Sequence, residues 1–276
     1  MKTTRESKTP GKFEQATVGQ SALRSAIIAI GCIIIPMWAM PPSAAAKAGS
    51  KLNIVLIISD DHGGRDSRCY GNTDTRTPNL DRLAGEGMRF THAFAASTLC
   101  SPSRAVIDTG LMPFRNGGHV FGGWVRGGTK SIADYFHDLG YQTANIGKFS
   151  KHPDNAFPYE YVKKRWSPHE HDAGLVDLVD EFLTGRDTDK PLFMEINTAD
   201  THMPWLQNKG YDTSGLAVPP HLVDTKETRD ALAEYYTSVE TLDANIGKFL
   251  ACLERNGYRD HTLVIYTSDH GANFPF

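Results

Sequence analysis

The sequence predicts an α/β fold, a doubly wound layer architecture in which helices cover both faces of a mostly parallel sheet. Apolar, β-branched runs alternate with amphipathic segments along the chain. The first run, residues 52–58 (LNIVLII), is continuously apolar, which is typical of a strand buried on both faces of a parallel sheet. Polar clusters follow several of these runs, as expected where strands end at a ligand site.

The elements are expected in the following order. After the first strand, residues 77–87 form a helix with proline near its start and glycine at its end. A second helix starts near Pro102 and ends at Gly110. The remaining predictions are helices at 131–140, 174–185 and 227–257, and strands at 142–147, 191–197 and from 262 onward.

Composition and charge exclude some partners. The chain has 276 residues, of which 22% are charged, and a formal net charge of −3. Neither a basic surface for nucleic acid nor an acidic tail is expected from this balance. Arginine-rich and aromatic stacking motifs for RNA or DNA are also missing from the sequence. We therefore expect no nucleic-acid partner.

Residues 1–48 have the pattern of a secretory signal peptide. Basic residues precede the apolar run at 25–40, and small residues ending in Ala46-Lys47-Ala48 follow it. A membrane anchor is the rival interpretation, but the run is short for a span and Pro36 interrupts it. A faint lipobox at Cys32 is a further alternative, although apolar residues continue beyond it. We expect residues 49–276 to be periplasmic or secreted, without a stable membrane partner.

Removal of the signal would leave three cysteines, Cys69, Cys100 and Cys252. An odd number in an oxidising compartment permits at most one intramolecular bridge, so one thiol must be free or modified. Cys100 is the best candidate for that thiol. Whether Cys69 and Cys252 pair is left open by the sequence.

Two acidic clusters indicate a metal site. Asp60 and Asp61 follow the first strand, and Asp269 and His270 follow the last one. Adjacent carboxylates need a compensating cation, and hard divalent cations favour carboxylate oxygens, with histidine able to complete the ligand set. Either pair alone would be read as a solvated turn. Their occurrence at two strand ends favours a metal site, and a third cluster containing His202 follows the strand at 191–197.

Cys100 lies in the segment STLCSPSRAVIDT, residues 97–109. We expect it just before the helix that Pro102 starts, where unpaired N–H groups and the helix dipole bind anions and lower the pKa of a thiol. Arg104, in the first turn, adds a guanidinium suited to an oxyanion. The alternative is an incidental loop cysteine beside a capping serine.

The segment CSPSR at 100–104 resembles the C-x-P-S-R signature of the type I sulfatases, formylglycine-dependent members of the alkaline-phosphatase superfamily. Other segments are similar to the family in the same order, and the likeness extends from Leu52 to the end of the chain. The layout is most similar to the heparan N-sulfatase (sulfamidase) group. The segments are TPNLDRLAGEGMRFTHAFAAS at 77–97, DTG at 108–110, IGK at 146–148 and TSDHG at 267–271.

The resemblance implies a sulfatase-like sheet flanked by helices and a hydrolase that removes sulfate from a sulfated sugar or glycan, as in glycosaminoglycan degradation. It implies that a formylglycine-generating, sulfatase-maturing enzyme converts Cys100 to Cα-formylglycine, the nucleophile precursor. Arg104 would stabilise the hydrated aldehyde, Lys148 would hold the sulfate group, and His202 would contact sulfate and leaving group. One divalent cation, usually calcium, would be held by the strand-end residues Asp60, Asp61, Asp269 and His270.

Two departures from the family pattern matter. Sulfatases commonly have a histidine two residues after the lysine of IGK, whereas this chain has Ser150 there and His152 four residues after Lys148. We keep His152 as an additional catalytic candidate. The chain also ends at Phe276, so we expect residues 49–276 to be the N-terminal portion of an incomplete catalytic domain. A phosphodiesterase or phosphonate monoester hydrolase of the same superfamily, and an inactive glycan-binding remnant, stay open as alternatives.

Overall fold

The computed structural model describes residues 51–164 and 174–274. The expected signal peptide, residues 1–48, lies outside the described residues. None of the helices in the described ranges combines the length and apolar character needed to cross a bilayer.

The centre of the fold is a five-stranded parallel sheet with the order β3-β2-β4-β1-β5. Four strands confirm the sequence prediction. The fifth, β3, was not predicted, because its YVKK sequence is mostly exposed at the sheet edge and lacks an apolar run. The strands are β1 (Asn53–Ser59), β2 (Gln142–Gly147), β3 (Tyr161–Lys164), β4 (Leu192–Asn197) and β5 (Thr262–Ser268).

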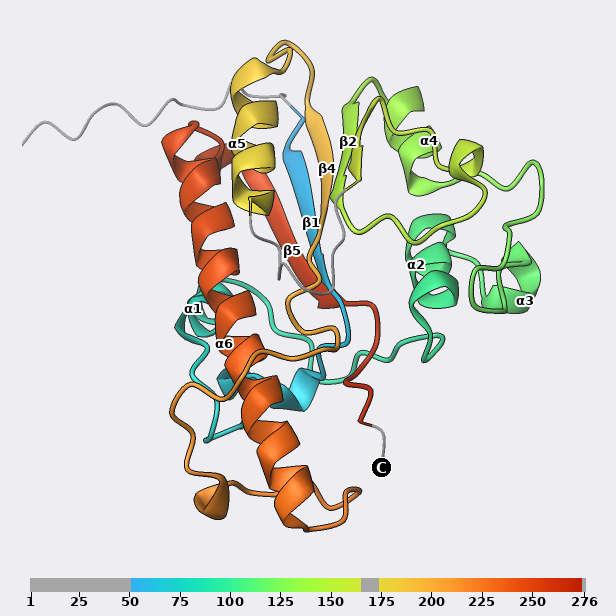
Figure 1. The fold of residues 1–276 in the computed structure, drawn as a ribbon. Helices are drawn as coiled ribbons and strands as arrows, with labels where there is room; N and C mark the ends of the chain where they lie inside the picture. Colours follow the sequence, from blue (N-terminus) through green and yellow to red (C-terminus); the bar gives the residue numbers. More distant parts are fainter. Residues whose placement is uncertain (1–50, 165–173, 275–276) are drawn as a thin grey trace, which may run out of the picture. The chain divides into compact units, whose positions relative to one another are not determined.

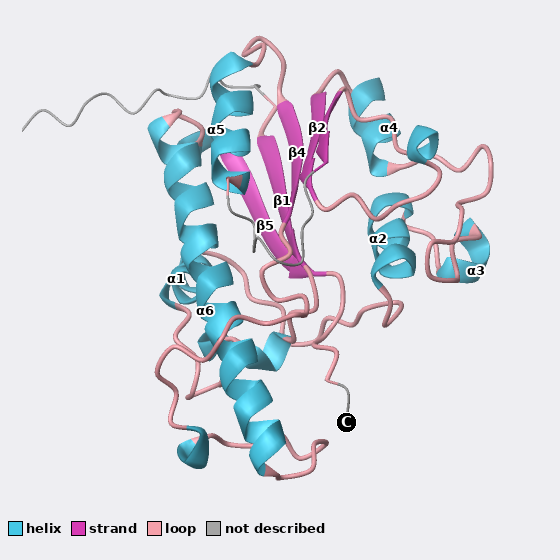
Figure 2. Cartoon of the chain, viewed as in Figure 1, coloured by secondary structure: helices cyan, strands magenta, loops and turns pink. Residues whose placement is uncertain are grey.

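Helices cover both faces of this sheet (Figure 1). Helices α5 and α6 lie on one face, and α2 and α4 lie on the other, as the cartoon in Figure 2 shows. This confirms the doubly wound α/β prediction. The helices are α1 (Pro78–Glu86), α2 (Cys100–Thr109), α3 (Pro113–Asn116), α4 (Ile132–Asp138), α5 (Leu175–Gly185) and α6 (Lys226–Arg255).

Strand β4 shows why the sheet is buried on both sides. Leu192, Met194 and Ile196 belong to the apolar cluster beneath α5 and α6, whereas Phe193 belongs to the cluster on the α2 and α4 side. Successive side chains of a strand point to opposite faces. A strand with apolar residues at adjacent positions can therefore pack against two helical layers at once.

The 30-residue helix α6 packs together with α5 on one face of the sheet. Its N-terminus is capped by Thr225, whose hydroxyl accepts a hydrogen bond from the Thr228 amide. Helix α1 has no side-chain cap of its own, and the α6 carboxylate of Asp243 accepts hydrogen bonds from the backbone amides of Asn79 and Leu80. A long-range contact thus replaces a local cap and joins α1 to α6.

Register places the ends of β1 and β5 side by side. Ser59 of β1 pairs with Ser268 of β5, and Ile57 pairs with Tyr266. On its other edge, β1 pairs Ile58 with Asn197, the last residue of β4. The residues that follow these strands are therefore brought together at the carboxyl ends of the strands, where parallel sheets bind ligands.

Gly147 ends β2 where the chain approaches β4 most closely. Its φ is +106°, and an added Cβ would lie 2.1 Å from the backbone oxygen of Asn197. Gly128 also has a positive φ, +80°, but an added Cβ there meets nothing within 4 Å. The two glycines therefore separate the cost of a positive φ from the cost of a backbone clash.

We expect Gly147→Ala to destabilise the protein by about 2–5 kcal/mol, combining about 1–2 kcal/mol for the conformation with about 1–3 kcal/mol for overpacking. Gly128→Ala should cost only the first part. Urea unfolding of both variants measures the difference. Equal losses would show that β2 can move away from β4 at no cost.

Candidate active site

A buried carboxylate cluster lies where β1 and β5 end. Ligand-type oxygens of Asp60, Asp61 and Asp269 all lie within 4.8 Å of one another. The backbone builds this arrangement, because the Asp269 amide donates to the Ser59 carbonyl at 3.0 Å and the Asp61 amide donates to Asp269 Oδ1 at 3.1 Å. Asp61 has a positive φ of 59°, an unusual conformation that aspartate tolerates better than most residues.

Cys100 lies against this cluster, 9% exposed. It is the first residue of α2, with Leu99 as the N-cap, so it belongs to the helix and does not precede it as expected. Its Sγ is 3.3 Å from His270 Nε2 and 3.9 Å from Asp61 Oδ1. His270 Nδ1 is 2.9 Å from the Gly271 carbonyl, so we assign the ring proton to Nδ1. The Nε2 lone pair then faces the cluster, as a metal ligand requires.

The expectation of a lowered thiol pKa at Cys100 is wrong. Burial, followed by the negative charge of Asp60, raises the pKa of the Cys100 thiol to about 12, and Lys148 opposes this only in part. Burial and nearby carboxylates outweigh the helix N-terminus here. Cys100 is therefore held as a neutral thiol and not as a thiolate nucleophile.

Arg104 is fully buried and holds the cluster together. Its Nε donates to Asp269 Oδ2 at 3.0 Å, its Nη1 donates to Asn197 Oδ1 at 2.5 Å, and its Nη2 lies 3.4 Å from Asp60 Oδ1. One planar group thus links the ends of β1, β4 and β5 to α2. Each contact uses a separate N–H of the rigid guanidinium fork, which lysine could not reproduce.

Lys148 supplies the second positive charge. Its Nζ forms an ion pair with Asp60 Oδ2, and its backbone amide donates to the Asn197 carbonyl at 3.1 Å. Burial alone would raise the pKa of Asp60, but the charges of Arg104 and Lys148 hold it well below its usual range. Burial and the Asp60 charge raise the pKa of Asp61 to about 6, although His270 opposes the rise.

The donor set fits a hard divalent cation. Three buried carboxylates face two buried cationic side chains, which leaves an excess of negative charge where the oxygens converge. Carboxylate oxygens completed by an imidazole nitrogen suit Ca²⁺ or a similar ion. Arg104 pairs with Asp269 through Oδ2. The other atoms that converge are Asp269 Oδ1, Asp61 Oδ1 and His270 Nε2, and these could bind a metal ion.

The two histidine candidates are placed differently. A ring nitrogen of His202 lies with Asp60 and Cys100 in a group whose ligand-type atoms are within 4.8 Å of one another. His152 belongs to none of the metal-ligand groups found among the described residues, and its carbonyl accepts from the Val125 amide at 2.7 Å. Ser150 instead lies near the site, with its hydroxyl 3.1 Å from that of Ser101.

Sequence reasoning missed polar residues that support the site. Asn197 binds Arg104, Ser103 Oγ donates to the Asp269 carbonyl, and Thr201 Oγ1 donates to the Asp60 carbonyl at 2.6 Å. Asn197 could have been found, because it ends a buried strand as Ser59 and Ser268 do. The open question about the other cysteines is also answered, because Cys69, Cys100 and Cys252 are all free thiols.

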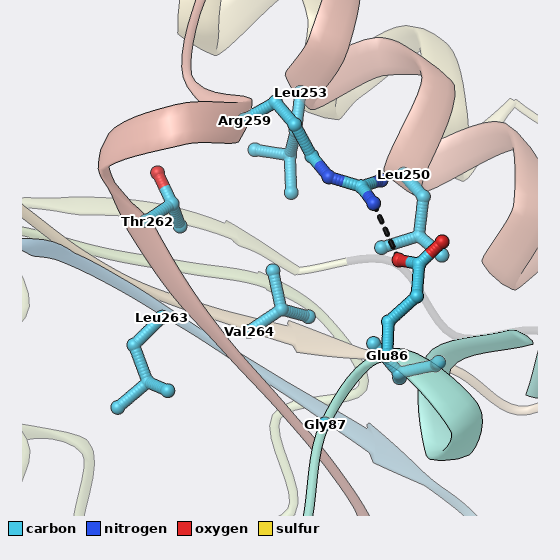
Figure 3. Close-up of a pocket in the computed structure, with 9 residues that line it drawn as sticks. Glu86, Gly87, Leu250, Leu253, Arg259, Thr262, Leu263 and Val264 are labelled. Carbon is cyan, nitrogen blue, oxygen red and sulfur yellow. Dashed lines mark hydrogen bonds and ion pairs between the residues drawn. The ribbon is translucent and has the colours of Figure 1, made fainter.

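A separate hollow lies between α1, α6 and β5 (Figure 3). Its walls are largely apolar, and Arg259 and Glu86 form an ion pair at 2.5 Å across it. No member of the carboxylate cluster lines it. The concentration of buried ionisable groups around Cys100, and not this hollow, marks the site.

Comparison with known proteins identifies a family match. The family model described as Sulfatase matches residues 52–275. An ulvan-active sulfatase from Formosa agariphila is 30% identical over 239 residues, covering 84% of this chain and 47% of the relative. The human N-sulphoglucosamine sulphohydrolase is 30% identical over 260 residues, covering 81% of this chain and 51% of the relative.

A solved structure from work on glycosaminoglycan metabolism by Bacteroides thetaiotaomicron shares the fold. It gives a TM-score of 0.70 at 22% identity and covers 80% of this chain and 62% of that one. At this identity the likeness shows the fold alone. The chain spans about half the length of the curated relatives it matches.

We expect Arg104→Met to destabilise the protein by about 3–5 kcal/mol, because it leaves the buried Asp269 carboxylate without its ion-pair partner and removes one of the two cations that contact Asp60. Urea unfolding measures the loss. Arg76→Met is the matched control, since Arg76 forms an exposed ion pair with Glu240 and should change the midpoint little. A loss no greater than that of the control would contradict the role assigned to Arg104.

Proposed function

Because the chain belongs to the sulfatase family, we propose that the protein hydrolyses a sulfate ester or sulfamate on a sulfated sugar or glycan. The observation that carries the proposal is the position of Cys100, at the start of α2 and against a buried carboxylate cluster. Cys100 begins the CSPSR segment that the family match covers. The proposal treats Cys100 as the precursor of Cα-formylglycine, made by a sulfatase-maturing enzyme as the protein is exported to the periplasm or beyond.

A formylglycine at position 100 would supply a hydrated aldehyde: one hydroxyl would attack sulfur while the bond from sulfur to the sugar oxygen or nitrogen breaks, and the second hydroxyl would expel sulfate and restore the aldehyde. A bound Ca²⁺ would polarise the sulfate oxygens. Asp60, Asp61, Asp269 and His270 would hold the cation. The position of Cys100 supports this assignment, because its Sγ lies 3.9 Å from Asp61 Oδ1 and 3.3 Å from His270 Nε2, two of the residues that would hold the cation.

The cationic side chains would bind and orient the sulfate. Lys148 lies at Asp60 and would offer a compact charge to the sulfate oxygens, whereas the buried Arg104 contacts Asp60, Asp269 and Asn197. We therefore assign Arg104 to holding the carboxylates and the residue at position 100 in place. His202, beside Asp60 and Cys100, would hold a proton for the leaving oxygen or nitrogen. His152 is the second candidate for this proton.

The named relatives support a carbohydrate substrate. One is called an ulvan-active sulfatase and another an N-sulphoglucosamine sulphohydrolase. The second name specifies an N-sulfated sugar, whereas the first does not say which group carries the sulfate. The proposal therefore covers both O-sulfate and N-sulfate.

The full chain, co-expressed with a sulfatase-maturing enzyme, should hydrolyse an aryl sulfate faster than an aryl phosphodiester. Cys100→Ala should lower the sulfatase rate by at least about 10³-fold, because it removes the nucleophile precursor. Cys69→Ala is the matched control and should keep the rate. Faster phosphodiester turnover would favour a phosphodiesterase instead.

Mass spectrometry of the peptide holding Cys100 should show a loss of about 18 Da, as thiol-to-aldehyde conversion requires, and an unmodified thiol would contradict the proposal.

We expect Ca²⁺ to raise the melting temperature, because the carboxylate cluster binds it only when folded. At 100 times the dissociation constant, one site adds about 2.7 kcal/mol. Asp61→Asn should abolish this gain, whereas Asp138→Asn, at an exposed ion pair with Lys130, should keep it. A thermal shift assay with and without Ca²⁺ measures the effect. An unchanged gain in Asp61→Asn would place the ion elsewhere.

A further inference from the structure

A second group of buried ionisable side chains comes from α2, β4 and the segment that follows β2. We call Lys151, Asp108, Glu195 and Tyr159 the buried tetrad; each is at most 7% exposed. Lys151 Nζ donates to Glu195 Oε1 at 2.7 Å and Oε2 at 2.9 Å, and it lies 2.6 Å from Asp108 Oδ2, an ion pair without hydrogen-bond geometry. The Tyr159 hydroxyl bridges the two acids, at 2.7 Å from Asp108 Oδ1 and 2.5 Å from Glu195 Oε2.

The surroundings of Lys151 are aromatic. Its ammonium lies 5.1–5.8 Å from the ring centroids of Phe149, Phe157 and Tyr159. Burial and then the Glu195 charge raise the pKa of Asp108 to about 7, against the effect of Lys151. Apolar residues in place of a buried ion network are often neutral or stabilising. Stability alone therefore gives little reason for charged groups at these positions.

The tetrad joins the same three segments that carry the site. On α2, Asp108 lies four residues beyond Arg104 and eight beyond Cys100, so one helix face presents all three. On β4, Glu195 lies two residues before Asn197 and therefore on the same face. Lys151 lies three residues after Lys148, in the segment that follows β2. These segments also carry the site. Both Arg104 and Lys148 contact Asp60, and each also bonds to Asn197.

We propose that the buried tetrad is a positioning network, which fixes α2 and the segment after β2 against β4 and so holds Arg104 and Lys148 at Asp60. The inference rests on the proposed function and deepens it. Lys151 and Asp108 act as positioning residues, since their ion pairs and hydrogen bonds are made within the tetrad and not with Cys100.

The test replaces the whole tetrad with apolar residues, Lys151→Met, Asp108→Leu, Glu195→Met and Tyr159→Phe, so that no buried charge is left unpaired. We expect the full-length variant to keep its melting temperature and to lose about 10- to 100-fold in kcat on aryl sulfate, with KM changed less than about threefold. Arg186→Met removes a buried cation that binds Gln142, Tyr258 and the Lys190 carbonyl, and it should leave kcat unchanged.

A second readout does not depend on turnover. Backbone amides of residues 147–152 should exchange with deuterium at least about 10-fold faster in the apolar variant than in the wild type. If the wild type hydrolyses no sulfate ester, the proposed function fails and the exchange rates alone decide the positioning role. An apolar variant that keeps both kcat and the wild-type exchange rates would overturn the inference.

Discussion

The buried guanidinium of Arg104 is the interaction on which the site depends. It is contacted by Asp60 after β1, Asn197 at the end of β4 and Asp269 after β5, while its own backbone belongs to α2. Three strand ends and one helix are therefore held at a single group. Removing this cation would leave the buried Asp269 carboxylate without its arginine partner and Asp60 with Lys148 as its remaining cation. Buried charges without a compensating partner are costly.

The same site carries an electrostatic imbalance that suits a cation. Asp60 is satisfied by Arg104 and Lys148, whereas burial raises the pKa values of Asp61 and Asp269. Cys100 is adjacent to this excess of negative charge and has a raised thiol pKa. The arrangement is poor for a cysteine that acts as a thiolate and well suited to a position that is modified and works beside a bound metal ion.

Much of the fold follows from local patterns. Strands β1, β4 and β5 were predictable because of their apolar runs, and β2 because it follows directly on a helix that was expected to end at Gly140. Gly110 marks the end of α2 with φ +64°. Strand β3 was missed because pairing with β2, and not its own polar sequence, makes it a strand. The thiol pKa was predicted in the wrong direction because the helix N-terminus is visible in the sequence and the burial of Cys100 is not.

Residue identity and spacing along the chain were enough to predict the α/β class, the strand ends that carry Asp60, Asp61, Asp269 and His270, and the motif that begins at Cys100. The folded chain was needed to see that the Ser150 hydroxyl lies beside that of Ser101, and that Asp108, Lys151 and Glu195 form one buried group. These contacts join residues up to 49 positions apart, and their partners are set by strand register and helix packing, which no local pattern encodes.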